Sequence, residues 1–369
     1  MGTILLISAS FGGGHDVAAR RIADQLGGLG YGTRVVDLLS LLPGGLGPAL
    51  RHGYRVQLGL APASWTWMCD ASGRPRVGGA AATLARLAAP RLLDLITADT
   101  AAVVSTYPLA SQLLGQLRSS GELAVPAVTV LTDMSVHRLW INAGVDGHVA
   151  MHPVAAAAAH RLGARGVTIG GPLVSNAFRP AADGEQRAAR ITLGLPTNRP
   201  LALVAAGSWG VGQLARSAID IEATGLATPV VACGRNRAGR MRLATAGIGI
   251  PLGWIDDMPG LFHACDVVVQ SGGGLSAQEA LACGKPVLTY RCLPGHGRSN
   301  AAALDEAGWA PWVRGTTGLE VALAGTIGRH ATALDRCTPR AADLIAAIMN
   351  PRMPERRHPI VPIPALVAT

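Results

Sequence analysis

Aromatic residues are scarce in this chain, at 4% of 369 residues. Carbohydrate-binding modules and RNA-binding platforms depend on stacked rings, so we expect neither class. Clustered arginines with interleaved aromatics are also missing, which argues against nucleic acid as a partner. The six cysteines form no CxxC pair and have no histidine at zinc-ligand spacing, so we expect reduced thiols and no metal site.

Long hydrophobic runs are absent too. No apolar stretch reaches the ~20 residues that span a bilayer, so we expect no transmembrane helix. The N-terminus reads MGTILLISAS, a strand pattern without a basic region or a cleavage site, and we therefore expect no signal peptide. These absences favour a cytoplasmic protein.

Lysine is nearly missing, since Lys285 is the only one, yet the formal net charge is +9. An excess of arginine favours an anionic partner such as a nucleotide diphosphate or phospholipid head groups, although an ordinary solvated surface gives the same count. The segment 46–76 mixes basic and bulky apolar residues, which suits either an interfacial membrane patch or a lid that packs on the core. Its members are Arg51, Arg55, Trp65, Trp67, Met68, Arg74 and Arg76.

Short β-branched runs alternate with amphipathic segments along the whole chain, which is typical of βαβ units. The strand candidates are 4–8, 33–39, 101–106, 127–133, 147–151, 201–207, 229–234, the stretch to Trp254, 266–272 and 285–290. Helical spacing covers 15–26, 184–193 and 339–349. We predict an α/β fold with two Rossmann-like domains, 1–172 and 173–349, whose parallel sheets face across a cleft, followed by a Pro-rich tail, 350–369. Ligands of such sheets bind beyond the carboxyl ends of the strands.

The first motif is SASFGGGHDVAA at 8–19, between a strand and a helix. Gly12, Gly13 and Gly14 allow a ligand to approach the backbone, and the helix N-terminus favours an anion. His15 lies at the helix start, where the helix dipole lowers its pKa and keeps a neutral imidazole available as a base. The alternative is a tight strand–helix turn that His15 only caps.

The second motif is TDMSVHRLWINAGVD at 132–146. Asp133 ends a strand and therefore points into the predicted cleft, where it could orient or deprotonate an acceptor hydroxyl. A strand-terminal aspartate is also a common helix cap. His137 and Arg138 follow in a polar loop.

Two further glycine-rich segments follow strands of the second domain. The first is AAGSWGVGQL at 205–214, whose glycines, with Ser208, could surround a diphosphate. The second is CGRN at 233–236, which places Arg235 and Asn236 at the end of another strand. The segment 266–308 is more specific: a glycine triplet follows Ser271, and Glu279 lies one turn into the helix 276–282. A glutamate there can accept both ribose hydroxyls. Asn300, after the loop PGHGRS, is expected to open the next helix.

These motifs, in this order, resemble GT-B glycosyltransferases of the monogalactosyldiacylglycerol synthase and processive diacylglycerol glycosyltransferase type. They are also similar to the peptidoglycan lipid-linked N-acetylglucosaminyltransferase. The resemblance implies a UDP-sugar held by the C-terminal domain, an acceptor in the N-terminal domain, and inverting transfer that needs neither a metal nor a cofactor. His15 is the first choice for the base and Asp133 the second.

The resemblance also implies which residues surround the substrates. The donor-binding residues are Gly207, Ser208, Arg235, Asn236, Ile255, Ser271, Gly272, Gly273, Gly274, Glu279, His296, Arg298 and Asn300. The acceptor-binding residues are Gly12, Gly13, Gly14, His137 and Arg138.

Three departures from the family pattern affect specificity. Val174 stands where the family has an arginine after GxP, so Arg179 or Arg235 is the candidate replacement for a phosphate contact. His296 and Arg298 replace an amide and an acid in the loop that reads the sugar, and Trp209 replaces a small polar residue. The acceptor is a lipid, which would bring the protein to the inner face of the membrane, or a soluble natural product. A UDP-sugar 2-epimerase-like enzyme and a non-catalytic nucleotide-sugar-binding protein are the alternatives.

Overall fold

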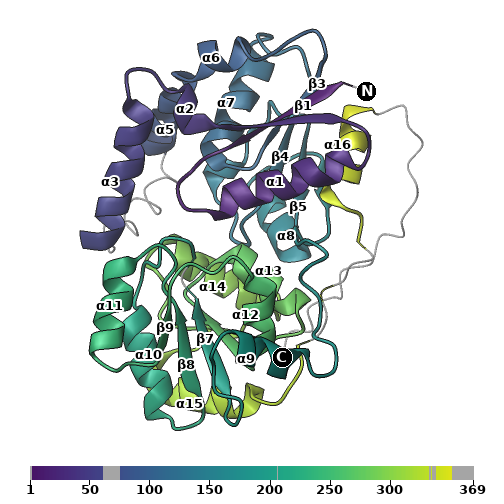
Figure 1. Ribbon diagram of the computed structural model, residues 1–369. Helices are drawn as coiled ribbons and strands as arrows, with labels where there is room; N and C mark the ends of the chain where they lie inside the picture. The colour runs from purple at the N-terminus through teal and green to yellow at the C-terminus, as the bar shows by residue number, and fades with distance from the viewer. Residues whose placement is uncertain (1, 61–74, 206, 332–333, 335–337, 351–369) are drawn as a thin grey trace.

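The chain folds into two α/β domains, one above the other in Figure 1. The computed structural model describes residues 2–60, 75–205, 207–331, 334 and 338–350. Each domain holds one sheet in which every strand pair is parallel. The predicted fold class, two Rossmann-like domains of the GT-B arrangement, is confirmed.

The N-terminal sheet has six strands in the order β2-β1-β3-β4-β5-β6. In chain order they are β1 (Thr3–Ser8), β2 (Gly32–Asp37), β3 (Thr100–Ser105), β4 (Ala127–Leu131), β5 (Gly147–Ala150) and β6 (Val167–Ile169). All five residues of β4 are buried. Parallel strands covered on both faces read as continuous apolar runs, which is why the sequence predicted the central strands well.

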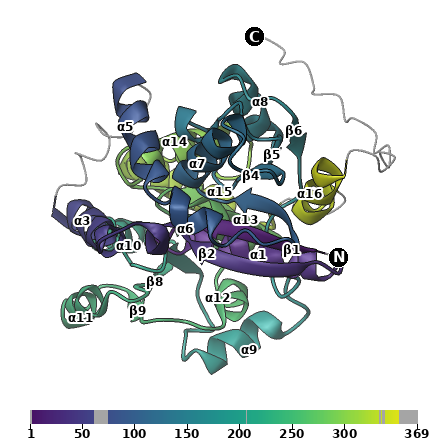
Figure 2. The ribbon, with the colours of Figure 1, turned by 90° about the horizontal axis from the view of Figure 1, so that it is seen from above.

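Helices cover both faces of this sheet (Figure 2). They are α1 (Gly14–Gly27), α2 (Leu38–Leu41), α3 (Leu46–Leu60), α5 (Pro75–Arg86), α6 (Ala89–Leu93), α7 (Pro108–Ser119), the short 3₁₀ helix η1 (Arg138–Trp140) and α8 (Pro153–Arg161). α1 packs on one face, while α2, α6 and α7 pack on the other.

The C-terminal sheet has five strands in the order β11-β10-β7-β8-β9. They are β7 (Leu201–Ala205), β8 (Thr228–Ala232), β9 (Ile250–Leu252), β10 (Val267–Gln270) and β11 (Val287–Thr289). Its helices are α9 (Glu185–Thr192), α10 (Leu214–Ala223), α11 (Arg237–Thr245), α12 (Met258–Ala264), α13 (Gly274–Ala282), α14 (His296–Glu306) and α15 (Gly315–Thr326). The core on one face holds α12, α13 and α14, and that on the other holds α10 and α15.

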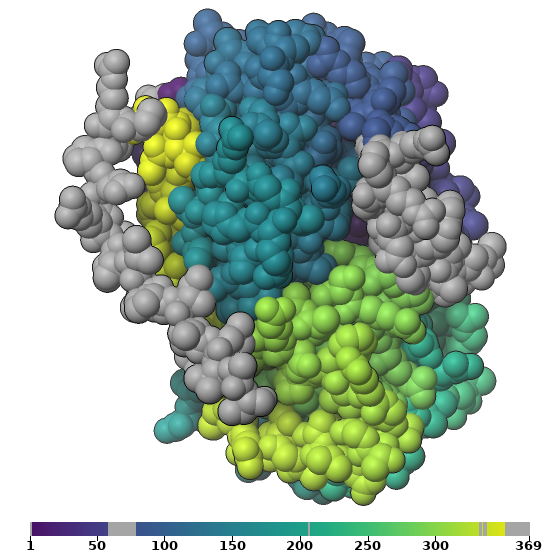
Figure 3. Space-filling view, turned by 180° about the vertical axis from the view of Figure 1, so that it is seen from behind, coloured from purple at the N-terminus to yellow at the C-terminus, as the bar shows by residue number. Residues whose placement is uncertain are grey.

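The last helix, α16 (Ala341–Met349), belongs in space to the N-terminal domain. Ala341, Ala342 and Ile345 are buried in the same core as α1, β4 and β5. In Figure 3, α16 (yellow) lies against the N-terminal domain (teal and blue). The sequence-based division, which ran the second domain from 173 to 349, misplaced this helix, because an apolar helical face does not reveal which of two cores it fills.

The chain therefore crosses between the domains twice, and the two crossings lie side by side. The Gly171 N–H donates to the Pro339 carbonyl at 2.8 Å. Side chains of each domain also pack in the other's core: Met134, after β4, joins the C-terminal core, and Leu275, at the start of α13, packs on the N-terminal core. These contacts fix how the loops at the carboxyl ends of the two sheets meet.

Most elements begin or end one or two residues from the predicted bounds, and two of the differences have a side-chain explanation or concern a predicted site residue. β2 ends at Asp37, whose carboxylate accepts from the Leu39 N–H at 3.0 Å and so caps α2, where a strand was expected to continue to 39. Asn300 does not open a helix, because α14 begins at His296 and Asn300 lies buried in its second turn.

Candidate active site

His15 is held at the start of α1, at the interdomain face of the N-terminal domain. Its Nδ1 lies 3.0 Å from Thr132 Oγ1. The Thr132 hydroxyl donates to the Thr106 carbonyl at 3.4 Å, which leaves the Thr132 oxygen free to accept a hydrogen bond from His15 Nδ1. This arrangement favours the tautomer with the proton on Nδ1 and a lone pair on Nε2.

The charge state of His15 is set mainly by its surroundings. Burial lowers the pKa of His15 below its ordinary value, and the carboxylate of Asp133 opposes this shift. The predicted direction is the same, but the sequence argument attributed it to the helix dipole, whereas burial is the largest cause. A neutral imidazole with a free Nε2 has the properties of a general base.

Asp133 follows β4 and faces the C-terminal domain. Its Oδ1 lies 3.4 Å from His296 Nε2, and only 13% of its side chain is exposed. Burial alone would raise the pKa of Asp133, but His296, His15 and His137 together hold it far below its usual range. A carboxylate of such low basicity takes up a proton poorly, so the geometry favours His15 over Asp133 as the base.

His137 and Asn300 complete this cluster. Burial lowers the pKa of His137 to about 4, and its ring centroid lies 6.2 Å from that of His296. The Asn300 carbonyl oxygen accepts from the Ser135 N–H at 2.9 Å and from the Ser135 hydroxyl at 2.7 Å, across the domain boundary. Asn300 Nδ2 donates to the Gly272 carbonyl at 3.2 Å. Asn300 thus ties the glycine triplet to the loop after Asp133.

Aromatic side chains gather beside His15 from both domains. The Tyr107 ring lies edge-on to His15 with centroids 5.0 Å apart, and Phe11 stacks on Tyr107 at 5.7 Å. Tyr54 of α3 contacts Phe11 at 5.2 Å and Trp209 of the C-terminal domain at 6.0 Å. Trp209, one of the three departures, therefore faces the acceptor side of the cleft.

The glycine loops of the two domains meet here. A Cβ added at Gly13 would lie 3.1 Å from Ser208 Oγ, so a side chain at that point would crowd the serine hydroxyl of the other domain. Gly12 has φ +101° and Gly207 has φ +67°, both favourable only for glycine. The structure thus brings Gly12, Gly13 and His15 into one region with Gly207 and Ser208.

The glycine triplet after β10 is organised by Gln270, which sequence reasoning missed. The Gln270 side-chain oxygen accepts from the N–H groups of Gly272 at 3.0 Å and Gly273 at 2.5 Å, and its amide donates to Thr289 at 3.0 Å. Two N–H groups expected to face phosphates are therefore already bonded. Gly274 begins α13 behind them, and the helix N-terminus there remains the predicted contact for an anion.

Glu279 lies in α13 near α1 of the other domain. Burial raises the pKa of Glu279 to about 7, while the guanidinium of Arg21 opposes this shift. A raised pKa at a half-buried carboxyl marks a candidate functional residue, so Glu279 stays the predicted contact for the ribose.

The two polar residues of the CGRN turn have different contacts. Asn236 caps α11 by accepting from the Gly239 N–H at 2.8 Å and donates to the Gly210 carbonyl at 3.0 Å, so its side chain is committed to the fold. Arg235 lies over the Trp254 ring, with Cζ 4.2 Å from the centroid, next to Ile255. Arg235, Trp254 and Ile255 therefore remain together as the expected base-binding corner.

The remaining predicted residues lie around this centre. Arg138 and Arg298 are exposed, and the Ser271 carbonyl accepts from the Leu293 N–H at 3.0 Å. In the basic segment, Arg51 pairs with Asp37 at 2.8 Å and Arg55 lies over Trp209 with Cζ 5.9 Å from the ring centroid. Trp65, Trp67, Met68 and Arg74, with the side chain of Arg76, lie outside the described residues.

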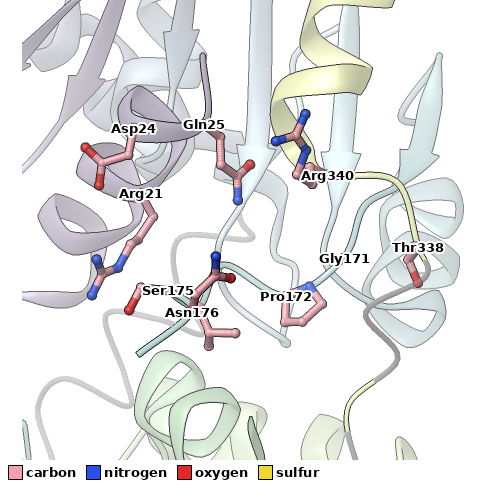
Figure 4. A pocket seen from close by; sticks show the side chains of 10 residues that line it. Arg21, Asp24, Gln25, Gly171, Pro172, Ser175, Asn176, Thr338 and Arg340 are labelled. Carbon is pink, nitrogen blue, oxygen red and sulfur yellow. The ribbon is translucent and has the colours of Figure 1, made fainter. Parts of the chain in front are cut away.

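A pocket of about 390 Å³ opens between the domains beside the two crossings (Figure 4). It is lined by Arg21, Asp24, Gln25, Gly171, Pro172, Val174, Ser175, Asn176, Thr338 and Arg340.

None of the described helices is both long and apolar enough to cross a bilayer. Within the described ranges, no group of three His, Cys, Asp or Glu side chains is placed to hold a metal ion.

Comparison with known proteins agrees with this geometry. The family model of monogalactosyldiacylglycerol (MGDG) synthase matches residues 15–169. The processive diacylglycerol beta-glucosyltransferase of Bacillus pumilus is 23% identical over 216 residues, which cover 56% of this chain and 55% of that protein. The Bacillus subtilis protein of the same name is 24% identical, with 56% of each chain covered. The chain thus spans about half the length of the curated relatives it matches.

Solved structures show the same fold over nearly the whole chain. MurG of Acinetobacter baumannii aligns with a TM-score of 0.54 and 14% identity, covering 88% of this chain and 90% of that one. HepE of Anabaena, solved with UDP and glucose, aligns with a TM-score of 0.52 and 14% identity, covering 95% and 93%. At these identities the likeness concerns the fold. The chain therefore has the GT-B fold, and its residues 15–169 match the family model of MGDG synthase.

Proposed function

We propose that this protein transfers a sugar from a UDP-sugar to a hydroxyl group of a lipid acceptor, with inversion at the anomeric carbon and without a metal ion. The observation that carries the proposal is His15, a neutral imidazole with a free Nε2, opposite the glycine loops of the second domain. Structures of similar fold that hold UDP, and relatives named as diacylglycerol glucosyltransferases, support the donor and the acceptor class.

In the proposed reaction, the acceptor hydroxyl gives its proton to His15 Nε2 as its oxygen attacks the anomeric carbon. The bond between that carbon and the diphosphate oxygen breaks, and UDP leaves with the electron pair. Because attack and departure take place on opposite faces of the sugar, the configuration inverts. The N-terminus of α13 at Gly274 and nearby arginines neutralise the diphosphate, which is a metal-free way to stabilise the leaving group.

Asp133 and His296 support this step from either side of the cleft. With Asp133 ionised, a histidine that gains a proton is stabilised beside it, so Asp133 stabilises the imidazolium form of His15 after proton transfer. His296 belongs to the loop that reads the sugar and holds Asp133 in place. We assign His15 the role of base and Asp133 that of positioning residue.

The acceptor side combines rings with an exposed helix. Phe11, Tyr54 and Tyr107 offer apolar faces near His15, and Val56 of α3 is exposed. A half-buried aromatic wall beside an arginine-bearing helix suits a lipid presented at an interface. We therefore place the protein in the cytoplasm, at the inner face of the membrane.

Incubation of the protein with labelled UDP-glucose, UDP-galactose or UDP-N-acetylglucosamine, with and without vesicles that contain diacylglycerol, tests the proposal. We expect UDP release that depends on the vesicles and a labelled glycolipid of inverted configuration. A labelled product with a soluble acceptor only would overturn the lipid assignment. Interconversion of the UDP-sugar without release of UDP would indicate an epimerase, and the absence of both reactions would indicate a binding protein.

A further inference from the structure

Arg21 lies two turns along α1, on the wall of the interdomain pocket (Figure 4). Its Nε is buried and has no hydrogen-bond partner among the residues that the structure describes. Buried polar groups in folded proteins are nearly always paired, and an unpaired cationic donor costs more than a neutral one. A ligand that accepts hydrogen bonds would remove this cost.

Val174 lines the same pocket. It stands at the junction position where the sequence pattern expects an arginine that contacts phosphate. The two replacements suggested by the sequence are committed elsewhere: Arg179 pairs with Glu185 at 2.6 Å, and Arg235 covers the Trp254 ring. Two arginines line the pocket with Val174: Arg340 pairs with Asp343 at 2.9 Å, which leaves Arg21 as the candidate cation at this wall.

The carboxyl of Glu279 is a charged neighbour of Arg21. The guanidinium of Arg21 acts on the pKa of Glu279, so the two charges are neighbours, yet they form no ion pair within 4.0 Å. A nucleotide offers both kinds of group that would fill such a gap. Its ribose hydroxyls donate to a carboxylate, and its phosphate oxygens accept from a guanidinium.

We propose that Arg21 binds the diphosphate of the donor nucleotide and replaces the junction cation that Val174 lacks. This inference rests on the proposed function, because it concerns the same donor. A planar guanidinium suits the recognition of phosphate oxygens, and a contact from α1 makes donor binding depend on both domains.

Calorimetric titration of the full chain with UDP and with uridine tests this assignment. Arg21→Met keeps the aliphatic stem and removes the charge, and Arg20→Met is the matched control, since Arg20 is an exposed neighbour on the same helix. We expect Arg21→Met to weaken UDP binding at least ~10-fold, the scale of a lost charge-assisted hydrogen bond, with uridine affinity unchanged and the melting temperature of the free protein no lower than that of the wild type. Arg20→Met should bind both ligands as the wild type does.

A second variant reverses the substitution. If Arg21 and position 174 serve the same diphosphate, Val174→Arg in the Arg21→Met background should restore UDP binding to within ~3-fold of the wild type, about 0.65 kcal/mol. Unchanged UDP binding in Arg21→Met, or equal losses for UDP and uridine, would overturn the role of Arg21 while leaving the donor assignment intact. A wild-type protein that binds no UDP would overturn the proposed function itself.

Discussion

His296 Nε2 lies 3.4 Å from Asp133 Oδ1 and 3.1 Å from Asn300 Nδ2. The amide of Asn300 is oriented by the Ser135 N–H, which donates to its oxygen, so its nitrogen faces His296 as a donor. One ring nitrogen cannot accept from Asn300 and donate to Asp133 at the same time. The tautomer with its proton on Nδ1 therefore accepts from Asn300 within α14, and a ring with a proton on Nε2, charged or neutral, donates to Asp133 across the cleft.

The first prediction concerns stability against pH. Burial alone would lower the pKa of His296, but the Asp133 carboxylate raises it above its ordinary value of 6.5. A raised histidine pKa contributes stability that is fully present below 6.5 and is lost as the pH rises through the folded-state value. We expect His296→Gln to lower the melting temperature by about 2 °C or more at pH 6 and by much less at pH 9. His330→Gln, at an exposed histidine, is the control, and a pH-independent difference would contradict the pairing.

The second prediction concerns the base. His15→Ala should reduce turnover at least ~100-fold while the Kd for UDP stays within twofold, because general-base catalysis contributes about that much. Thr132→Val removes the oxygen that holds Nδ1 and should lower turnover with little change in KM. Measurement of kcat and Kd on the same preparations separates the two effects, and wild-type turnover in His15→Ala would remove His15 from this role.

The third prediction follows from Glu279. Burial raises its pKa to about 7, so the carboxyl is largely protonated at pH 6 and ionised at pH 8. If the ionised form accepts the ribose hydroxyls, uridine should bind roughly tenfold more weakly at pH 6 than at pH 8. Uridine is the right probe because it carries no titrating phosphate. Glu279→Gln should bind weakly at both pH values, and a wild-type affinity independent of pH would argue against this contact.

The fourth prediction distinguishes the contribution of Gln270 to folding stability from its effect on UDP binding. Gln270→Leu leaves the N–H groups of Gly272 and Gly273 unpaired, and we expect a loss of about 1–3 kcal/mol in the free energy of unfolding. Gln270→Glu keeps the acceptor oxygen but adds a negative charge behind the glycine triplet. This variant should fold, and its affinity for UDP should fall further below the wild-type value than its affinity for uridine does. Equal stability of Gln270→Leu and wild type in urea would show that these bonds are not needed.

The sequence predicted the strands of both sheets except β6, and missed what depends on contacts between distant segments. Parallel strands such as β4 and β10 are buried on both faces, so their apolar runs were unambiguous. His15 and Asp133 follow strand ends, which topology alone brings to the same edge. The pairing of Asp133 with His296, by contrast, depends on how two domains dock, and no local pattern encodes that. Gln270 looked like a strand residue, although a buried amide before a glycine triplet is a signal that could have identified it.

The hydrogen bond between Gly171 and Pro339 has a consequence for how the molecule is held together. Because two adjacent connections lie on one side, we expect any opening of the domains to move Trp209 away from Tyr54 more than it moves the edge near Val174. A protease that cleaves only one connection should leave both domains in one particle on a native sizing column. The two connections thus form a double hinge at one edge of the domain interface, and we expect the opposite edge to be the one that opens.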